Sequence, residues 1–170
     1  DTKDLKKKKN FDELISISGE EYCNKISYLD KTKKFFTDKA PLNFKYIGFI
    51  KHIFPEAKII NCKRDSLDVS WSIFKNYFSG SLLFSNDLKD IASFYNSYEK
   101  LITFWKDKFP GFIYDIQYEN LVDNPKKEIS KLLNYCKLDW DDNCLNHHKN
   151  TRSIKTASST QARKPIYKSA

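Results

Sequence analysis

The chain has 170 residues, in which 30 Lys and Arg outnumber 22 Asp and Glu and give a formal net charge of +8. Hydrophobic residues make up 40% and aromatic residues 15%, which excludes disorder over most of the chain. No apolar run approaches the roughly 18 residues that cross a bilayer, so we expect no membrane partner. This length predicts a single domain over residues 1–170, with a polar lead-in over 1–10 and a basic tail over 149–170.

The excess of positive charge is concentrated in that tail. From Lys149 to Ala170 there are six basic residues and no acidic ones, so the tail carries six of the eight net charges. A concentrated excess favours a site for a compact anion or an interaction arm, whereas a diffuse excess is typical of general nucleic-acid binding. We therefore expect no nucleic-acid partner and keep a basic-tailed nucleic-acid-binding protein as an alternative.

The cysteines indicate neither a metal site nor a disulfide framework. They form no CxxC pair, and adjacent histidines point in different directions on a helix. The residues considered for a metal are Cys136, Cys144, His147 and His148. We expect reduced, buried thiols in a cytoplasmic protein and no bound metal.

The predicted elements alternate between helices and strands. One or two short helices are predicted over residues 11–29 with a break at Gly19, followed by a strand over 34–39 and a helix from Asn43 to Phe54. After these come a strand over 57–62, helices over 64–80 and 87–109, a strand over 112–118, and helices over 125–135 and 141–147. Because strands separated by helices favour a parallel sheet with helical crossovers, we expect an α/β layer fold.

The glycines argue against a nucleotide-binding loop of the Walker type. Such a loop needs two glycines a few residues apart, followed by Lys and Ser or Thr. The four glycines are Gly19, Gly48, Gly80 and Gly111, which are far from one another. A nucleotide site in this chain would therefore be different in kind or incomplete. The first residue is Asp1 and the chain has no Met, which is typical of a processed chain or a fragment.

The segment around Arg64 carries a candidate anion site. Arg64 stands at the carboxyl end of a predicted strand, where open α/β sheets bind ligands. Residues 65, 68, 69 and 72 share one face of the following helix, so Ser72 can look toward Arg64. An arginine, a hydroxyl and a helix N-terminus form a receptor for a phosphate monoester. A capped helix with a surface Arg–Asp pair remains the alternative.

Two further segments suit an anion without deciding the matter. Lys39 stands at a strand-to-loop junction before Pro41 and could neutralise charge on a leaving group, although a solvated loop lysine fits as well. The tail combines hydroxyls, amides and cations, but a disordered basic arm has the same composition.

Four strings, in this order and spacing, resemble a sulfotransferase: DKAPLNFKYIGFIKHIFPEAKIINCKRDSLDVSWS, YENLVDNP, LLNYCKLDW and TASSTQARKPIY. They resemble in particular the bacterial sulfotransferase domains that are often fused to tetratricopeptide repeats and are related to tyrosylprotein sulfotransferases. The resemblance covers about residues 11–170 and is most specific over FPEAKIINCKRDSLDVSWS. It implies a P-loop-NTPase-like three-layer α/β fold, with a parallel sheet flanked by helices and without the first strand–loop–helix.

The resemblance also implies an activity and its partners. The donor would be 3′-phosphoadenosine 5′-phosphosulfate, and the acceptor a hydroxyl of a protein tyrosine, a peptide or a carbohydrate. Sulfuryl transfer, like phosphoryl transfer, depends on positioning and electrostatic stabilisation, and cationic side chains remove the need for a metal. The resemblance leaves open a homodimer and upstream tetratricopeptide repeats.

The family's functional residues carry over to positions in this chain. Arg64 and Ser72 match the pair that grips the 3′-phosphate, and Tyr118 resembles a nucleotide-contacting tyrosine. Lys39 resembles the catalytic lysine, and Ser158 the tail serine near the sulfuryl group. The tail would wrap the nucleotide through Gln161, Arg163 and Lys164.

The chain departs from the family in two respects. Asn76 stands where the tyrosylprotein members carry a further arginine, which puts one phosphate contact in doubt. The Gly-rich loop and the helix with the catalytic glutamate do not appear before residue 30. We therefore expect an N-terminally truncated domain that does not turn over donor by itself. A non-catalytic nucleotide- or anion-binding module remains the other alternative.

Overall fold

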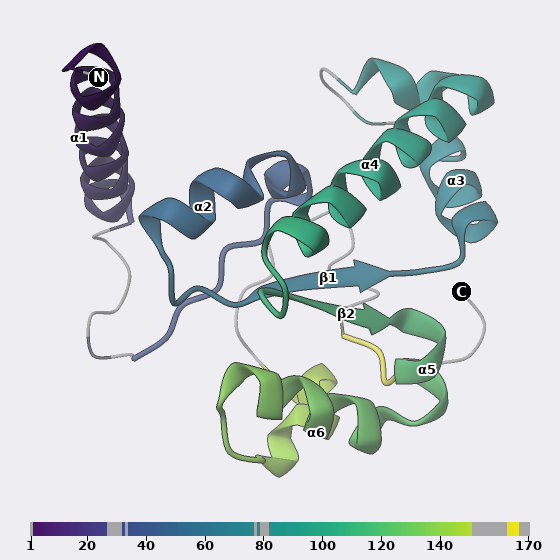
Figure 1. Cartoon of the computed structure of the whole chain (residues 1–170). Coiled ribbons are helices and arrows are strands. Elements are labelled where there is room, and N and C mark those ends of the chain that lie inside the picture. Colours follow the sequence, from purple (N-terminus) through teal and green to yellow (C-terminus); the bar gives the residue numbers. More distant parts are fainter. Residues whose placement is uncertain are drawn as a thin grey trace. The chain divides into compact units, whose positions relative to one another are not determined.

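The computed structural model describes residues 2–26, 32, 34–76, 78, 82–150 and 163–166 (Figure 1). The chain divides into two compact units. The first consists of Asp1–Ala57 and Tyr98–Lys108, and the second of Lys58–Ser97 and Phe109–Ala170. Helix α4 (Leu88–Lys108) contributes residues to both units.

The first unit contains helices that approach closely at glycines. They are α1 (Thr2–Lys25), the 3-10 helix η1 (Pro41–Tyr46), α2 (Ile47–Ile53) and the last part of α4. A Cβ on Gly19 of α1 would lie 2.8 Å from Cγ2 of Ile53, and one on Gly48 of α2 would lie 2.6 Å from Cη2 of Trp105. The indole N–H of Trp105 also donates to the Phe44 carbonyl at 3.0 Å. The absence of side chains at the two glycines therefore lets these helices pack.

Three predictions for this unit are wrong. Helix α1 passes through Gly19 without a break and includes residues of the predicted polar lead-in, because the glycine serves helix packing and not a helix end. Residues 34–40 form no strand, and the side chains of Phe35 and Phe36 are 58% and 55% exposed; no strand pairs with this segment within the described part of the chain. The helical turn begins after Ala40 with Pro41 in its first position, which suits proline's fixed φ, so Asn43 is not its cap.

The second unit is built on a small parallel sheet. Strand β1 (Ile59–Lys63) pairs with β2 (Ile113–Gln117), with Ile59 opposite Ile113 and Lys63 opposite Gln117. Figure 1 shows both arrows pointing the same way. The predicted α/β fold, with a parallel sheet flanked by helices, is confirmed.

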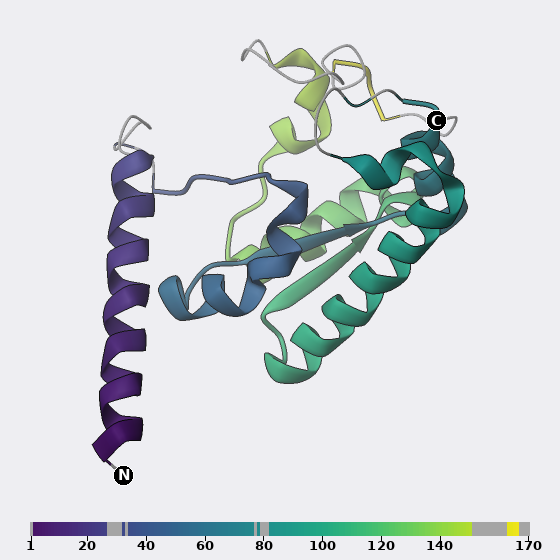
Figure 2. The same ribbon diagram turned by 90° about the horizontal axis from the view of Figure 1, so that it is seen from above.

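Helices follow each strand of this sheet. They are α3 (Ser66–Phe74) and the 3-10 helix η2 (Leu83–Asn86) after β1, then α5 (Tyr118–Asp123), α6 (Pro125–Cys136) and the 3-10 helix η3 (Asp142–Lys149) after β2. Helix α6 lies on one face of the two strands (Figures 1 and 2). The helix predicted over 64–80 ends as an α-helix at Phe74, and the other predicted elements of this unit agree to within a few residues.

Tyr135 ties α6 to the beginning of both strands. Its hydroxyl donates to the Phe112 carbonyl at 2.5 Å and lies 3.4 Å from the Ile59 carbonyl oxygen. Its ring stacks on Tyr114 of β2 with the centroids 5.0 Å apart. The helix and the sheet therefore share a polar and an aromatic contact.

The cysteines differ in part from the prediction. All four thiols are free, but Cys23 and Cys62 are exposed and not buried. Cys62 shares a side of β1 with Ile60, which is 40% exposed, because alternate residues of a strand point the same way. Among the described residues, no helix is long and apolar enough to cross a bilayer.

Candidate functional site

Two predicted nucleotide-binding residues meet where the parallel strands end. Lys63, the last residue of β1, pairs with Gln117, the last residue of β2, so Arg64 and Tyr118 directly follow the two neighbouring strands. The central guanidinium carbon of Arg64 lies 5.1 Å from the ring centroid of Tyr118, within the range of a cation–π contact. The parallel register thus brings together residues that are far apart in the chain, at the edge where α/β sheets bind ligands.

The Arg64 side chain has one occupied donor group and one buried donor without a partner. Its Nη2 donates to Oδ2 of Asp68 at 3.1 Å. Its Nε is buried and has no hydrogen-bond partner within the part of the chain that the structure describes. Because an unsatisfied buried donor costs about 1–3 kcal/mol, an anion that accepted this N–H would be favoured.

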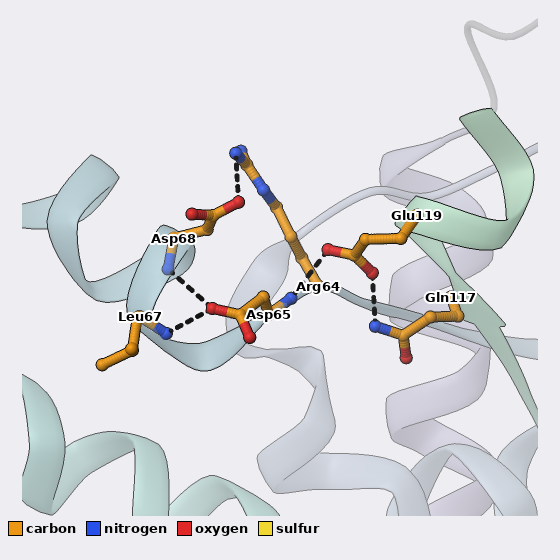
Figure 3. A network of polar contacts seen from close by, with 6 residues as sticks. All are labelled: Arg64, Asp65, Leu67, Asp68, Gln117 and Glu119. Carbon is orange, nitrogen blue, oxygen red and sulfur yellow. Dashed lines mark hydrogen bonds and ion pairs between the residues drawn. The ribbon is translucent and has the colours of Figure 1, made fainter. Parts of the chain in front are cut away.

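The N-terminus of α3 is already occupied by a side chain of the protein. Oδ1 of Asp65 accepts the backbone N–H groups of Leu67 at 2.9 Å and of Asp68 at 3.1 Å (Figure 3). These amides are therefore not open to a phosphate, contrary to the sequence-based expectation for this helix start. Both features of the alternative interpretation, a capped helix and an Arg–Asp pair, are present. An anion at this edge would be held by the guanidinium.

Ser72 lies farther along the same helix, on the face that carries Asp68. The helical rise places it about 6 Å beyond Asp68 along the axis. Its side chain is half-buried, and its carbonyl accepts the side-chain amide of Asn76 at 2.6 Å. The Asn76 side chain thus forms a hydrogen bond with a carbonyl of the last turn of α3. As an amide, it provides no positive charge for a ligand.

Glu119 is a member of this network that the sequence reasoning missed. One carboxylate oxygen accepts the backbone N–H of Asp65 at 2.9 Å, and the other accepts the side-chain amide of Gln117. These two hydrogen bonds, that of Asp65 first, hold the pKa of the Glu119 carboxyl below its usual range. The only signal in the sequence is its place directly after Tyr118, and its partner Asp65 becomes apparent only once the strand register is known.

The predicted catalytic lysine belongs to the first unit. Lys39 is exposed and follows Asp38, whose carboxylate accepts the hydroxyl of Tyr22 of α1 at 2.8 Å. Arg64, Ser72 and Tyr118 all belong to the second unit.

The described part of the basic tail contacts η3. Arg163 donates from Nη1 to the Asn150 carbonyl at 2.9 Å, and the Lys164 carbonyl lies 3.2 Å from Nε2 of His147. Both tail side chains are exposed. Ser158 and Gln161, the other predicted tail residues, lie outside the described residues.

Comparison with known proteins gives the family of this chain. The sequence profile of the sulfotransferase family matches residues 4–142. The chain belongs to the sulfotransferase family. The matched range includes both Arg64, which follows β1, and Tyr118, which follows β2.

Relatives of this sulfotransferase-family chain are longer proteins. An uncharacterized protein of Aquifex aeolicus is 38% identical over 164 residues, which are 94% of this chain and 22% of the relative. A "Putative protein-tyrosine sulfotransferase" of Caenorhabditis briggsae is 23% identical over 65% of this chain and 40% of its own length. A protein of the same name from Caenorhabditis elegans is 25% identical over 81% of this chain and 52% of its own. The chain therefore spans between about a fifth and a half of these relatives.

Proposed function

We propose that this sulfotransferase-family domain binds 3′-phosphoadenosine 5′-phosphosulfate by its 3′-phosphate, with Arg64 as the main contact. The observation that carries the proposal is the buried Nε of Arg64, which has no hydrogen-bond partner among the described residues; Arg64 directly follows β1, and its guanidinium carbon lies near the Tyr118 ring. A guanidinium matches the oxygens of a phosphate monoester and binds them with charge-assisted hydrogen bonds. The residues present therefore fit the 3′-phosphate.

The neighbours of Arg64 would divide the remaining work of binding. The Ser72 hydroxyl would donate a second hydrogen bond to the phosphate from the same face of α3. The Tyr118 ring would keep the guanidinium at the sheet edge through the contact at 5.1 Å. The tail residues Gln161, Arg163 and Lys164 would wrap the nucleotide, since their segment is rich in cations and hydroxyls.

The domain would serve the transfer of the sulfuryl group to an acceptor hydroxyl. In that step the bond between sulfur and the bridging oxygen of the 5′-phosphate breaks while a bond from the acceptor oxygen to sulfur forms. The acceptor proton passes to a base, and negative charge develops on the leaving phosphate. Lys39 and Ser158 would stabilise that charge, which makes a metal unnecessary.

We further propose a protein tyrosine as the acceptor. The support comes from the names of the two nematode relatives, which describe protein-tyrosine sulfotransferases. A phenol and a sugar hydroxyl differ in pKa and shape, so a tyrosine peptide and an oligosaccharide distinguish the two acceptor classes in a transfer assay.

A thermal-shift titration with 3′,5′-phosphoadenosine tests the nucleotide site. At about 100 times the dissociation constant, binding stabilises a protein by about 2.7 kcal/mol, which for this size raises the melting temperature by about 5–10 °C. We expect this shift in the wild-type chain, its loss in Arg64→Ala and a smaller shift in Ser72→Ala. Lys131→Ala is the matched control, since Lys131 is an exposed cation of α6 that pairs with Glu128.

Two other results would contradict parts of the proposal. A wild-type chain without any nucleotide response, but with tight and salt-sensitive DNA binding, would support the nucleic-acid alternative. Nucleotide binding by the complete natural protein, without sulfuryl transfer to a tyrosine peptide or an oligosaccharide, would indicate a non-catalytic nucleotide-binding module.

A further inference from the structure

We infer that Glu119 is a positioning residue for Arg64: its carboxylate locks the turn between β1 and α3 and thereby orients the guanidinium at the sheet edge. The effect of this lock on nucleotide binding rests on the proposed function. The lock itself rests on the hydrogen bonds of Figure 3.

The first contact acts on the peptide group that follows Arg64. The N–H that Glu119 accepts at 2.9 Å belongs to Asp65, and this N–H lies in the peptide plane that joins Arg64 to Asp65. Fixing the plane fixes the ψ angle of Arg64, which sets the direction in which α3 leaves β1. Asp68 of α3 binds the guanidinium at 3.1 Å, so the helix direction determines where the guanidinium is held.

The second contact makes Glu119 itself rigid. Its other oxygen accepts the side-chain amide of Gln117, the last residue of β2, which pairs with Lys63 of β1. The carboxylate is therefore bound at both oxygens, once to the last residue of β2 and once to the turn after β1. Because each of its oxygens accepts a hydrogen bond, the Glu119 side chain holds the turn after β1 in a fixed position relative to the end of β2.

The neighbouring residue supports the same side chain from another direction. Tyr118 places its ring 5.1 Å from the guanidinium carbon, and Glu119 binds the residue after Arg64. The first two residues of α5 thus contact the two residues that follow β1. Removing the Glu119 carboxylate would leave the ring contact but free the turn, so Arg64 would remain nearby with less order.

The lock can be tested without any nucleotide, by NMR on the 170-residue chain. We expect the Arg64 Nε–H to lose order in Glu119→Ala, and the Asp65 amide to exchange with solvent about fivefold to tenfold faster, as one lost hydrogen bond implies. Glu119→Gln should give order and exchange rates between those of the wild type and Glu119→Ala, because its amide oxygen can still accept the Asp65 N–H. This variant replaces Glu119→Ala in the test if Glu119→Ala fails to fold. Glu128→Ala, which removes an α6 carboxylate paired with Lys131, should match the wild type. Unchanged Arg64 order and Asp65 exchange in Glu119→Ala and Glu119→Gln would overturn the inference.

Calorimetric titration with 3′,5′-phosphoadenosine then tests the consequence for binding. We expect Glu119→Ala to weaken binding about fivefold to thirtyfold, Glu119→Gln to recover part of the loss, and Glu119→Ala to have no further effect in an Arg64→Ala background. A loss that persists in that background would show that Glu119 acts by another route. If the wild type does not bind, or Arg64→Ala binds equally well, the proposed function fails, while the NMR result still decides the role of Glu119.

Discussion

Asp65, Asp68 and Glu119 all belong to the network around Arg64, and each of them binds a different donor. Asp65 accepts two amides of α3, and Glu119 accepts the Asp65 amide and the Gln117 side chain. Of these three carboxylates, that of Asp68 forms the hydrogen bond to the guanidinium. Most of these carboxylate hydrogen bonds therefore fix the backbone. The buried Nε of Arg64, which has no hydrogen-bond partner among the described residues, is the donor that we propose for the 3′-phosphate.

The protonation of Glu119 makes a prediction about stability and pH. Hydrogen bonds from Asp65 and Gln117 lower its pKa in the folded chain, whereas the unfolded value is about 4.3. Its contribution is therefore complete above the unfolded value and is lost as the pH falls through the folded pKa. We expect the melting temperature of the wild type to exceed that of Glu119→Gln by a constant amount between about pH 6 and 8, and the difference to shrink below about pH 4.

The comparison of the two proteins isolates Glu119, because the substitution changes that side chain alone. Melting curves recorded by circular dichroism across the pH series measure the difference. A difference that stays the same at low pH would mean that the carboxylate charge of Glu119 does not stabilise the turn.

At the scale of elements, the helices and strands that are set by the pattern of hydrophobic residues and by proline and turn residues could be predicted from the sequence. Strands β1 and β2 are short segments with two isoleucines each that lie between turn residues, and Pro125 begins α6 because its fixed φ suits the first turn of a helix. The strand predicted over 34–39 is wrong because an apolar run becomes a strand only where another strand pairs with it. Glu119 was not predictable for a similar reason, since its partner Asp65 is set by the register of the sheet and not by nearby sequence.

The contact between α6 and the sheet makes a prediction at this scale. Tyr135→Phe keeps the ring stacked on Tyr114 but removes the hydroxyl that binds the Phe112 carbonyl. The substitution removes this part-buried hydrogen bond, so the free energy of unfolding should fall by about 1 kcal/mol. Urea denaturation measures this change.

Tyr46→Phe provides the matched control, because Tyr46 is 59% exposed. It should leave the free energy of unfolding within about 0.5 kcal/mol of the wild type. Equal effects of the two substitutions would show that the Tyr135 hydroxyl does not hold α6 to the sheet.

At the scale of the whole molecule, the proposed work is divided between two units. The second unit carries the residues proposed for the 3′-phosphate, and the first carries Lys39, proposed for the leaving group. The family match extends over both units, from residue 4 to residue 142. The chain spans 22–52% of the length of the relatives described above.

The preference of this chain for a 3′-phosphate tests the central claim most directly. Isothermal titration calorimetry gives the affinities of 3′,5′-phosphoadenosine and of 5′-AMP, which differ only in that group. Charge-assisted hydrogen bonds from Arg64 predict a preference of about 10-fold to 100-fold for the bisphosphate in the wild type and in Lys131→Ala, and almost none in Arg64→Ala. An undiminished preference in Arg64→Ala would contradict the account, because the 3′-phosphate would then be held by other residues.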